Sequence, residues 1–258
     1  MTEDHPLFRL PDSAGIELPP GELILSEQDK PALWLSDEPI EPGLWAQLRA
    51  GHERSGFWPL LLRPEADGGP WNEVDFDGLT APADHDPEAV LRTWWETYAG
   101  NEDENFIAPF GETWPDTPAP APPHRFDADK HADTVADSVL ADLPGMRLGL
   151  VAASSGAEAL TTAGWQGPLN YTNDTAKVSA VVGDWERRYG ARVIGIDGWA
   201  TLYLSVSAPP TDRDQARRTS AEHFAFCPDN FWQGAANATI RNYAHQLIDS
   251  DVWVFWWD

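Results

Sequence analysis

Short apolar runs and periodic apolar stripes alternate along the chain and predict a mixture of strands and helices. In the first half, the pattern predicts strands over residues 21–25, 32–35 and 58–62 and helices over residues 41–51 and 86–100. The second helix has the clearer start, because Asp86 suits the N-cap position and Pro87 the first turn. The two helices are expected to end at Gly51 and Gly100.

The second half is more strongly patterned and predicts helices layered on a sheet. Its predicted strands lie at 147–153, 192–196, 201–206 and 252–257, and its predicted helices at 155–165, 174–189, 211–226 and 238–249. Asp197-Gly198 suits a hairpin turn, and Thr211-x-x-Asp214 resembles a capping box. The run VWVFWW, residues 252–257, is apolar at both alternating sets of positions, which indicates a central strand covered on both faces.

A proline-rich stretch separates the two halves. TWPDTPAPAPPHR, residues 113–125, contains five prolines, which favour an extended and semi-rigid segment. We therefore predict an acidic, Trp-rich N-terminal region over 1–112, a Pro-rich linker with a weakly patterned helix over 113–142, and an α+β domain over 143–258. The predicted fold class is α+β, with a C-terminal mixed sheet of about four or more strands, helices packed on it, and an acidic α+β region before it.

Charge is unevenly distributed along the 258 residues, whose net charge is -25. Residues 1–142 hold 30 acidic and 8 basic residues, a net -22, whereas residues 143–258 hold 12 and 9, a net -3. Such an acidic half repels nucleic acid and anionic membranes and attracts basic partners. We therefore expect a non-enzymatic module that binds a basic protein, with an immunity-type role as one form of it. The alternative is that the acidity serves solubility alone.

The remaining composition indicates a cytoplasmic protein without a cofactor. The stretch MTEDHPLFRLPDS has neither a basic region nor an apolar region, so no signal peptide is predicted. The sequence contains no apolar run of the length that a membrane span needs, and its single cysteine suits a reducing compartment. No G-x-S-x-G, H-E-x-x-H or glycine-rich phosphate motif occurs, so no cofactor is expected. The oligomeric state stays open.

The stretch AEHFAFCPDNFWQG, residues 221–234, holds that cysteine and allows three interpretations. In a metal site, His223 and Cys227 would share a helix face, with Asp229 and His245 as further ligands, although zinc sites usually show two close pairs of ligands. In a hydrolase or transferase, the candidate catalytic residues are Glu222, His223, Cys227, Asp229 and His245. In the structural interpretation, which we favour, Cys227 is a small buried side chain, the proline after it stops the helix, and Asp229 caps the next turn.

Six arginines of the second half also allow two interpretations. They could form an anion-binding surface, or they could pair with the acidic N-terminal half across an interface; the charge asymmetry favours the second. The six are Arg187, Arg188, Arg192, Arg213, Arg217 and Arg218.

Three stretches of the second half resemble a bacterial domain of unknown function, family 4253. They are GPLNYTNDTAKVSAVVGDWERRYGARVIGI, AEHFAFCPDNFWQG and TIRNYAHQLIDSDVWVFWWD, and the resemblance covers roughly residues 143–258. Upstream, LWLSDEP and SGFWPLLLR look like the leader region of actinobacterial members. The resemblance implies the domain boundary and a bacterial cytosolic setting. It implies no reaction, and no catalytic residues carry over from it.

Overall fold

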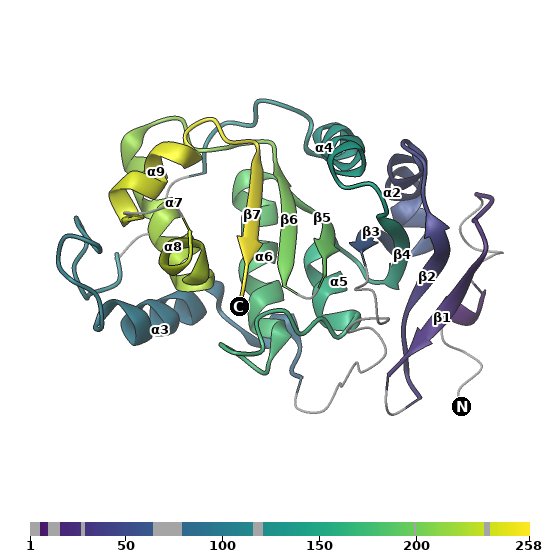
Figure 1. Ribbon diagram of the computed structural model, residues 1–258, viewed down its shortest axis with the longest axis horizontal. Helices are drawn as coiled ribbons and strands as arrows, with labels where there is room; N and C mark the ends of the chain where they lie inside the picture. The colour runs from purple at the N-terminus through teal and green to yellow at the C-terminus, as the bar shows by residue number, and fades with distance from the viewer. Residues whose placement is uncertain are drawn as a thin grey trace.

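The computed structural model describes residues 6–9, 16–26, 29–63, 79–115, 121–198, 200–234 and 238–258. Its centre is one seven-stranded sheet with the order β1-β2-β4-β3-β5-β6-β7 (Figure 1). The strands are β1 (Gly21–Leu25), β2 (Pro31–Pro39), β3 (Phe57–Arg63), β4 (Arg147–Ala152), β5 (Ala191–Asp197), β6 (Thr201–Val206) and β7 (Val252–Trp256). Only β3 and β5 pair in parallel among these strands, so the sheet is mixed and the α+β prediction is confirmed.

Helices cover both faces of the sheet. The α-helices of the described chain are α2 (Leu44–Ser55), α3 (Pro87–Ala99), α4 (Ala128–Asp142), α5 (Gly156–Thr162), α6 (Thr175–Tyr189), α7 (Arg213–Phe226), α8 (Asp229–Trp232) and α9 (Ile240–Leu247). Short 3-10 turns lie at η1 (Pro6–Arg9) and η3 (Pro82–Asp84). Helices α2 and α4 share one apolar cluster with β3 and β5, whereas α3, α5, α6, α7 and α9 share a larger cluster that covers the opposite face.

Two helix ends follow the local rules that the sequence suggests, whereas the predicted end at Gly51 is wrong, because α2 continues to Ser55 and ends at Gly56. Asp86 accepts a hydrogen bond from the backbone N–H of Glu88 and starts α3, as predicted. Gly190 ends α6 with φ 57°, a left-handed conformation that glycine adopts without a Cβ penalty. The predicted capping box at Thr211 is wrong. The side chain of Asp212 caps α7 instead, by accepting hydrogen bonds from the backbone N–H groups of Asp214 and Gln215.

The sheet crosses the limits of the predicted regions. Strand β3 comes from the N-terminal region, yet it lies between β4 and β5, which belong to the predicted C-terminal domain. It pairs with β4 through six residues and with β5 through three. The chain limits 1–112, 113–142 and 143–258 stay a prediction, and part of the Pro-rich linker, 116–120, lies outside the described residues.

Strand β7 differs from its prediction, because it lies at the edge of the sheet and not at its centre. Trp253, Phe255 and Trp257 point into the larger apolar cluster and are buried. Val254 and Trp256 point to the other face and are 41% and 39% exposed. Here an unbroken apolar run therefore corresponds to a strand with one buried and one exposed face, because apolar side chains occupy both faces.

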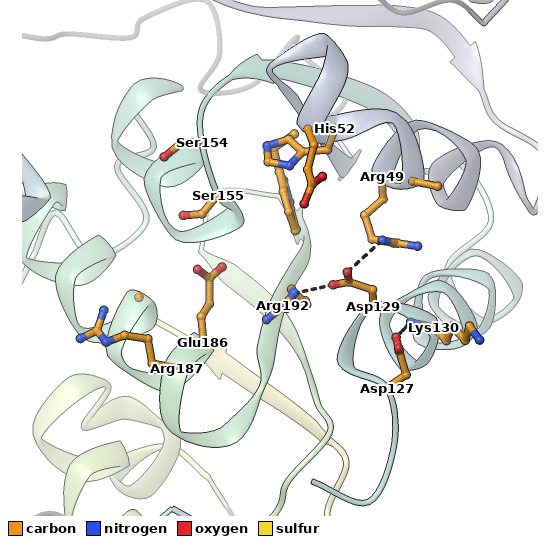
Figure 2. Close-up of a pocket in the computed structure, with 14 residues that line it drawn as sticks. Arg49, His52, Asp127, Asp129, Lys130, Ser154, Ser155, Glu186, Arg187 and Arg192 are labelled. Atoms are coloured by element: carbon orange, nitrogen blue, oxygen red, sulfur yellow. Dashed lines mark hydrogen bonds and ion pairs between the residues drawn. The ribbon is translucent and has the colours of Figure 1, made fainter.

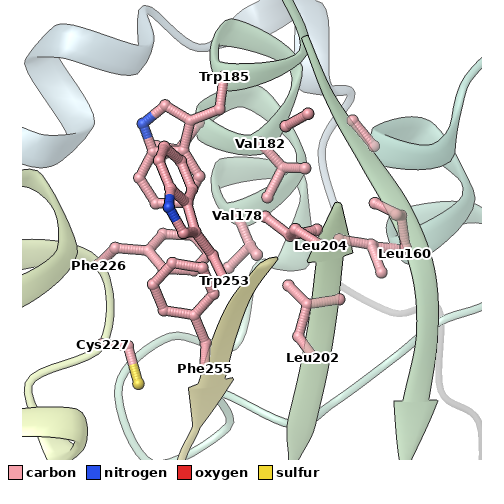
Figure 3. Close-up of a cluster of buried hydrophobic side chains, with 14 of the residues drawn as sticks. Leu160, Val178, Val182, Trp185, Leu202, Leu204, Phe226, Cys227, Trp253 and Phe255 are labelled. Atoms are coloured by element: carbon pink, nitrogen blue, oxygen red, sulfur yellow. The ribbon is translucent and has the colours of Figure 1, made fainter. Parts of the chain in front are cut away.

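The larger cluster is dense in aromatic rings where α6, α7 and β7 meet (Figure 3). Trp185 of α6 stacks on Phe255 with ring centroids 5.3 Å apart, and its edge meets Phe226 at 4.7 Å. Such offset and edge-on pairs add to the stabilisation that burial alone gives. This cluster joins α6 and α7 to the sheet edge. No helix among the described residues has both the length and the apolar character needed to span a bilayer.

Candidate functional site

Glu222, the first sequence candidate, is a structural ion-pair partner on α7. It is buried, and its carboxylate lies 2.6 Å from the Arg188 guanidinium of α6. The Trp185 indole N–H donates to the same carboxylate at 2.8 Å. Burial with good hydrogen bonding is the arrangement that allows a charged pair to persist in an interior. The carboxylate therefore holds α7 to α6.

His223 lies beside Glu222 but points into the aromatic cluster. It is fully buried, with its ring 4.5 Å from that of Trp253 and 4.7 Å from that of Phe255. Its Nδ1 is within 3.3 Å of the Tyr243 hydroxyl. Burial, with the nearby charge of Arg188, lowers the pKa of His223 well below its ordinary value, so the ring is neutral at physiological pH.

The Cys227 thiol is also buried and is hydrogen-bonded to the backbone. Its Sγ donates to the carbonyl of Trp256 at 3.0 Å. Burial raises the pKa of the thiol far above its ordinary range, so the nucleophilic thiolate is disfavoured. Figure 3 shows the side chain at the margin of the aromatic cluster, beside Phe255. This environment is typical of a structural cysteine.

The two residues that follow the proline complete a cover over the outer edge of β7. Asn230 donates from Nδ2 to the carbonyl of Val254 at 2.8 Å and accepts at Oδ1 from the N–H of Trp256 at 3.0 Å. Its side-chain amide thus replaces the backbone of a further strand. Asp229 accepts from the N–H of Asp258 at 3.0 Å. The segment 227–230, which we call the edge clamp, occupies hydrogen-bonding groups that an edge strand otherwise presents to other chains.

His245 is not brought into this group. It lies exposed on α9, whose buried face is formed by Ile240, Ala244 and Leu247. Within the described ranges, no cluster of three or more His, Cys, Asp or Glu residues has a geometry that could hold a metal ion. The geometry therefore assigns Glu222, His223, Cys227 and Asp229 to packing and hydrogen bonding, and it leaves His245 apart from them.

A polar pocket of about 790 Å³ lies elsewhere, at the end of the sheet where β4 leaves it and β5 begins (Figure 2). Ser154 and Ser155 follow β4, Glu186 and Arg187 come from the end of α6, and Arg192 opens β5. The wall opposite is built by the end of α2 and the start of α4. Sequence reasoning missed this site, apart from the suggestion that Arg187 and Arg192 could bind an anion.

Glu186 is the most unusual group in this pocket. It is half-buried, accepts from the Ala157 N–H at 3.0 Å and from the Ser155 hydroxyl, and Figure 2 shows its carboxylate directed towards Ser155. Burial raises its pKa to about 7, although nearby arginines act in the opposite direction. A carboxyl group with such a pKa exchanges its proton near neutral pH, which suits a ligand-binding or proton-transfer role.

An arginine–aspartate network forms the other wall. Asp129 accepts from the Nε of Arg192 at 2.8 Å and lies 3.3 Å from Nη1 of Arg49. Arg49 also makes a bidentate contact with Asp133, at 2.6 and 2.9 Å. These pairs hold two guanidinium groups at the pocket. Figure 2 shows the contacts of Asp129 with Arg49 and Arg192 as dashed lines.

The same network decides the interpretation of the arginines. Arg192 pairs with Asp129 of the acidic half, as we expected. Arg187, Arg188 and Arg217 instead pair with acids of their own half, at Asp184, at Asp184 and Glu222, and at Asp214. The predicted docking of charged halves is thus confirmed for Arg192 and wrong for these three, because partners three or four residues away on a helix are closer at hand.

A third polar region lies around Trp232 of α8, at the far end of the molecule from β1. Trp232 is 43% exposed, and its indole N–H donates to Glu102 at 2.6 Å. The ring of Tyr98 from α3 meets it edge-on at 5.7 Å. Asp103 and Glu104 follow Glu102 in the chain and are exposed. We call these five residues the acidic–aromatic surface.

The fold and these sites define an α+β protein built on one mixed sheet, with a clamped sheet edge, a polar pocket and an acidic–aromatic surface. Residues 147–258 match the family model described as Domain of unknown function (DUF4253). The match begins at β4 and extends through β7, which confirms the resemblance seen in the sequence. Comparison with curated proteins and with solved structures gave no match.

Proposed function

We propose that this protein is a non-enzymatic interaction module that binds a basic protein partner through the acidic–aromatic surface. The observation that carries the proposal is the exposed Trp232 ring set directly beside the Glu102 carboxylate. Exposed tryptophan is the residue most often found at the energetic centre of protein interfaces. An immunity-type role, in which the protein neutralises a basic toxin, is one form of this function, and we expect it to operate in the cytoplasm.

The charge of this region supports a basic partner. Between Arg92 and Arg125 the sequence contains no lysine or arginine, whereas it contains six acidic residues. Three of them are consecutive, at Glu102, Asp103 and Glu104. Such a local excess of one sign accelerates encounter with an oppositely charged surface and disfavours acidic competitors.

The aromatic part of the surface supplies what charge alone does not. Tyr98 and Trp232 are held in place by edge-on contacts with each other and with Phe224, which is fully buried. Rings fixed in this way bind without losing side-chain freedom, and they attract arginine or lysine by cation–π contact. A basic partner with an exposed arginine therefore matches both features.

The hydrolase or transferase alternative through residues 222–229 with His245 has weaker support. Glu222 is neutralised by Arg188, and the Cys227 thiol is bound to the carbonyl of Trp256. His245 lies exposed on a different helix. These contacts favour a role in folding for the segment.

The test is retention of a basic protein from the lysate of the source organism at low salt. We expect the wild type to retain such a protein and to release it as salt rises, because screening weakens charge attraction. The variants Trp232→Ala and Glu102→Gln/Asp103→Asn/Glu104→Gln should each weaken this binding by about tenfold or more.

The matched control removes the same charge from the opposite end of the sheet. Asp37→Asn/Glu38→Gln/Glu41→Gln changes three exposed acids on and after β2. Binding by this variant should stay within about twofold of the wild type. The proposal fails if no basic protein is retained at low salt, or if the control variant loses as much binding as the surface variant.

A further inference from the structure

We propose that the pocket between α2, α4 and α6, beside the end of β4 and the start of β5, binds a small molecule that carries an oxyanion, a carboxylate or a phosphate group. This proposal concerns a different part of the molecule from the acidic–aromatic surface and does not depend on it. The pocket volume of about 790 Å³ lies in the range that metabolite-sized ligands occupy.

Four basic side chains converge at this pocket in an otherwise acidic protein, beside four acidic ones, Glu53, Asp127, Asp129 and Glu186. Four of the 17 lysine and arginine residues line it, namely Arg49, Lys130, Arg187 and Arg192. Their positions on three helices and one strand show that the fold, and not a local run of sequence, brings them together. Convergent cations with bidentate geometry are the groups that recognise carboxylates and phosphates.

Asp129 positions two of these cations, Arg49 and Arg192, and one nitrogen of the Arg192 guanidinium can still donate to a ligand. Arg49 uses its guanidinium on Asp133 and Asp129. Arg192 donates from Nε to Asp129 and from Nη1 to the carbonyl of Ala191, so its Nη2 is the remaining donor group. Asp129 is thus a positioning residue, since it orients the guanidinium that would meet the oxyanion.

Lys130 and Arg187 supply more flexible positive charge at the rim. Within the residues that the structure describes, the Lys130 ammonium makes no ion pair. The Arg187 side chain is 68% exposed and contacts Asp184 through one nitrogen only. Both side chains can therefore turn towards a ligand at little cost in lost contacts.

Glu186 gives the site a dependence on pH. As a carboxylate it would repel an anion, whereas as a carboxylic acid it would donate a hydrogen bond to it. The charged and titratable groups that line the same pocket are His52 and Glu53 from α2, Asp127, Asp129 and Lys130 from α4, Arg187 from α6, and Arg192 from β5. Because burial raises the pKa of Glu186 to about 7, the acid form is available near neutral pH. Anion binding should therefore strengthen as pH falls through this range.

The test uses sulfate as the probe, because sulfate keeps its charge over the pH range concerned. Calorimetric titration at constant ionic strength, with chloride as the reference anion, should show saturable binding that is tighter at about pH 6 than at about pH 8. The variants Arg192→Gln and Lys130→Gln/Arg187→Gln should each weaken it by about tenfold. The second variant leaves the contacts of Asp129 intact, so it still tests sulfate binding if Arg192→Gln folds poorly.

Two further variants separate this site from general charge effects. Glu186→Gln should bind sulfate at about pH 8 as tightly as the wild type does at about pH 6, with the pH dependence lost. Arg217→Gln removes one positive charge outside the pocket and should leave sulfate binding unchanged, as should the Glu102→Gln/Asp103→Asn/Glu104→Gln variant. The proposal is overturned if sulfate does not saturate a site, or if Arg217→Gln weakens binding as much as Lys130→Gln/Arg187→Gln.

Discussion

The edge clamp at residues 227–230 and the pocket around Glu186 contain similar kinds of side chain but treat them in opposite ways. In the clamp, the thiol, amide and carboxylate each meet a backbone group of β7 or Asp258. In the pocket, the carboxyl of Glu186 meets one N–H and one hydroxyl and faces an open volume of about 790 Å³. A binding site is therefore indicated by polar groups that can still bond to a ligand from solvent, and not by reactive residue types alone.

The same contrast holds between two carboxylates of the α6–α7 pair. Glu222 is buried against the Arg188 guanidinium, whereas Glu186 has no ion pair within the described part of the chain. The first is a fixed charge that the fold requires. The second is a charge whose presence varies with pH. The predictions below test this difference, beginning with the largest expected effect.

Glu222→Ala should destabilise the protein by about 3 to 5 kcal/mol, because it leaves the Arg188 charge without its buried partner. Urea-induced unfolding at neutral pH, followed by tryptophan fluorescence, measures the change. Glu186→Gln is the matched control and should show no comparable loss. A cost below about 1 kcal/mol for Glu222→Ala would contradict the structural role of this pair.

Glu186→Gln should remove a dependence of stability on pH that is on the order of 2 kcal/mol. The folded-state pKa of Glu186 is raised from 4.5 to about 7, so its contribution to stability is fully present below the lower value. That contribution is lost as pH rises through about 7. The wild type should thus become less stable relative to Glu186→Gln over this interval, as measured by urea unfolding at a series of pH values. Parallel curves of stability against pH for the two proteins would show that the folded-state pKa of Glu186 is not raised.

Asn230→Ala should destabilise the protein by about 1 to 2 kcal/mol, since it leaves the Val254 carbonyl and the Trp256 N–H at the sheet edge without their partner. It should also promote self-association, because an uncovered edge strand pairs with other chains. Urea unfolding and size-exclusion chromatography at several concentrations measure both effects. The exposed Asn105 provides the control, and Asn105→Ala should change neither property.

Cys227→Ala should cost on the order of 1 kcal/mol and leave binding to a basic partner unchanged. Cys227→Ser should lose less if the hydroxyl keeps the hydrogen bond to the Trp256 carbonyl. Thermal unfolding compares the two variants. A complete loss of partner binding in a folded Cys227→Ser protein would place the thiol in the function and not in the fold.

Much of the fold could be predicted from the sequence, because its signals are local. The strand at 21–25, the helix begun by Asp86 and the helix ended by Gly190 all follow from apolar spacing and caps within a few residues. The order of the strands could not be predicted in this way. Nothing near Phe57–Arg63 indicates that this strand inserts between two strands more than 80 residues later in the chain.

The edge position of β7 was missed for a related reason. Alternating burial is visible in a sequence only when exposed positions are polar, and here Val254 and Trp256 are apolar on the open face. The clamp that compensates for this edge is formed by Cys227, Asp229 and Asn230, and the sequence pattern offered Cys227 and Asp229 as candidate ligands or catalytic residues. Only the paired backbone groups of β7 reveal what these side chains do.

The pocket lay beyond sequence reasoning because its members are far apart in the chain. Arg49 and Asp133 are separated by 84 residues, and Arg192 and Asp129 by 63. Neither Ser155 nor Glu186 belongs to a motif with recognisable spacing. The arginines at 187 and 192 gave the one usable signal, because an anion-binding surface was one of the two interpretations weighed for them.

The state of the Cys227 thiol tests most directly the claim that residues 221–234 serve the fold. Reaction with a chromogenic disulfide reagent should be negligible under native conditions and should reach one thiol per chain only when urea unfolds the protein, since the thiol is buried and the pKa of Cys227 is raised. The result we predict is labelling that rises with urea along the unfolding curve of the protein. Rapid stoichiometric labelling of the folded protein would contradict it and would return Cys227 to the candidate nucleophiles.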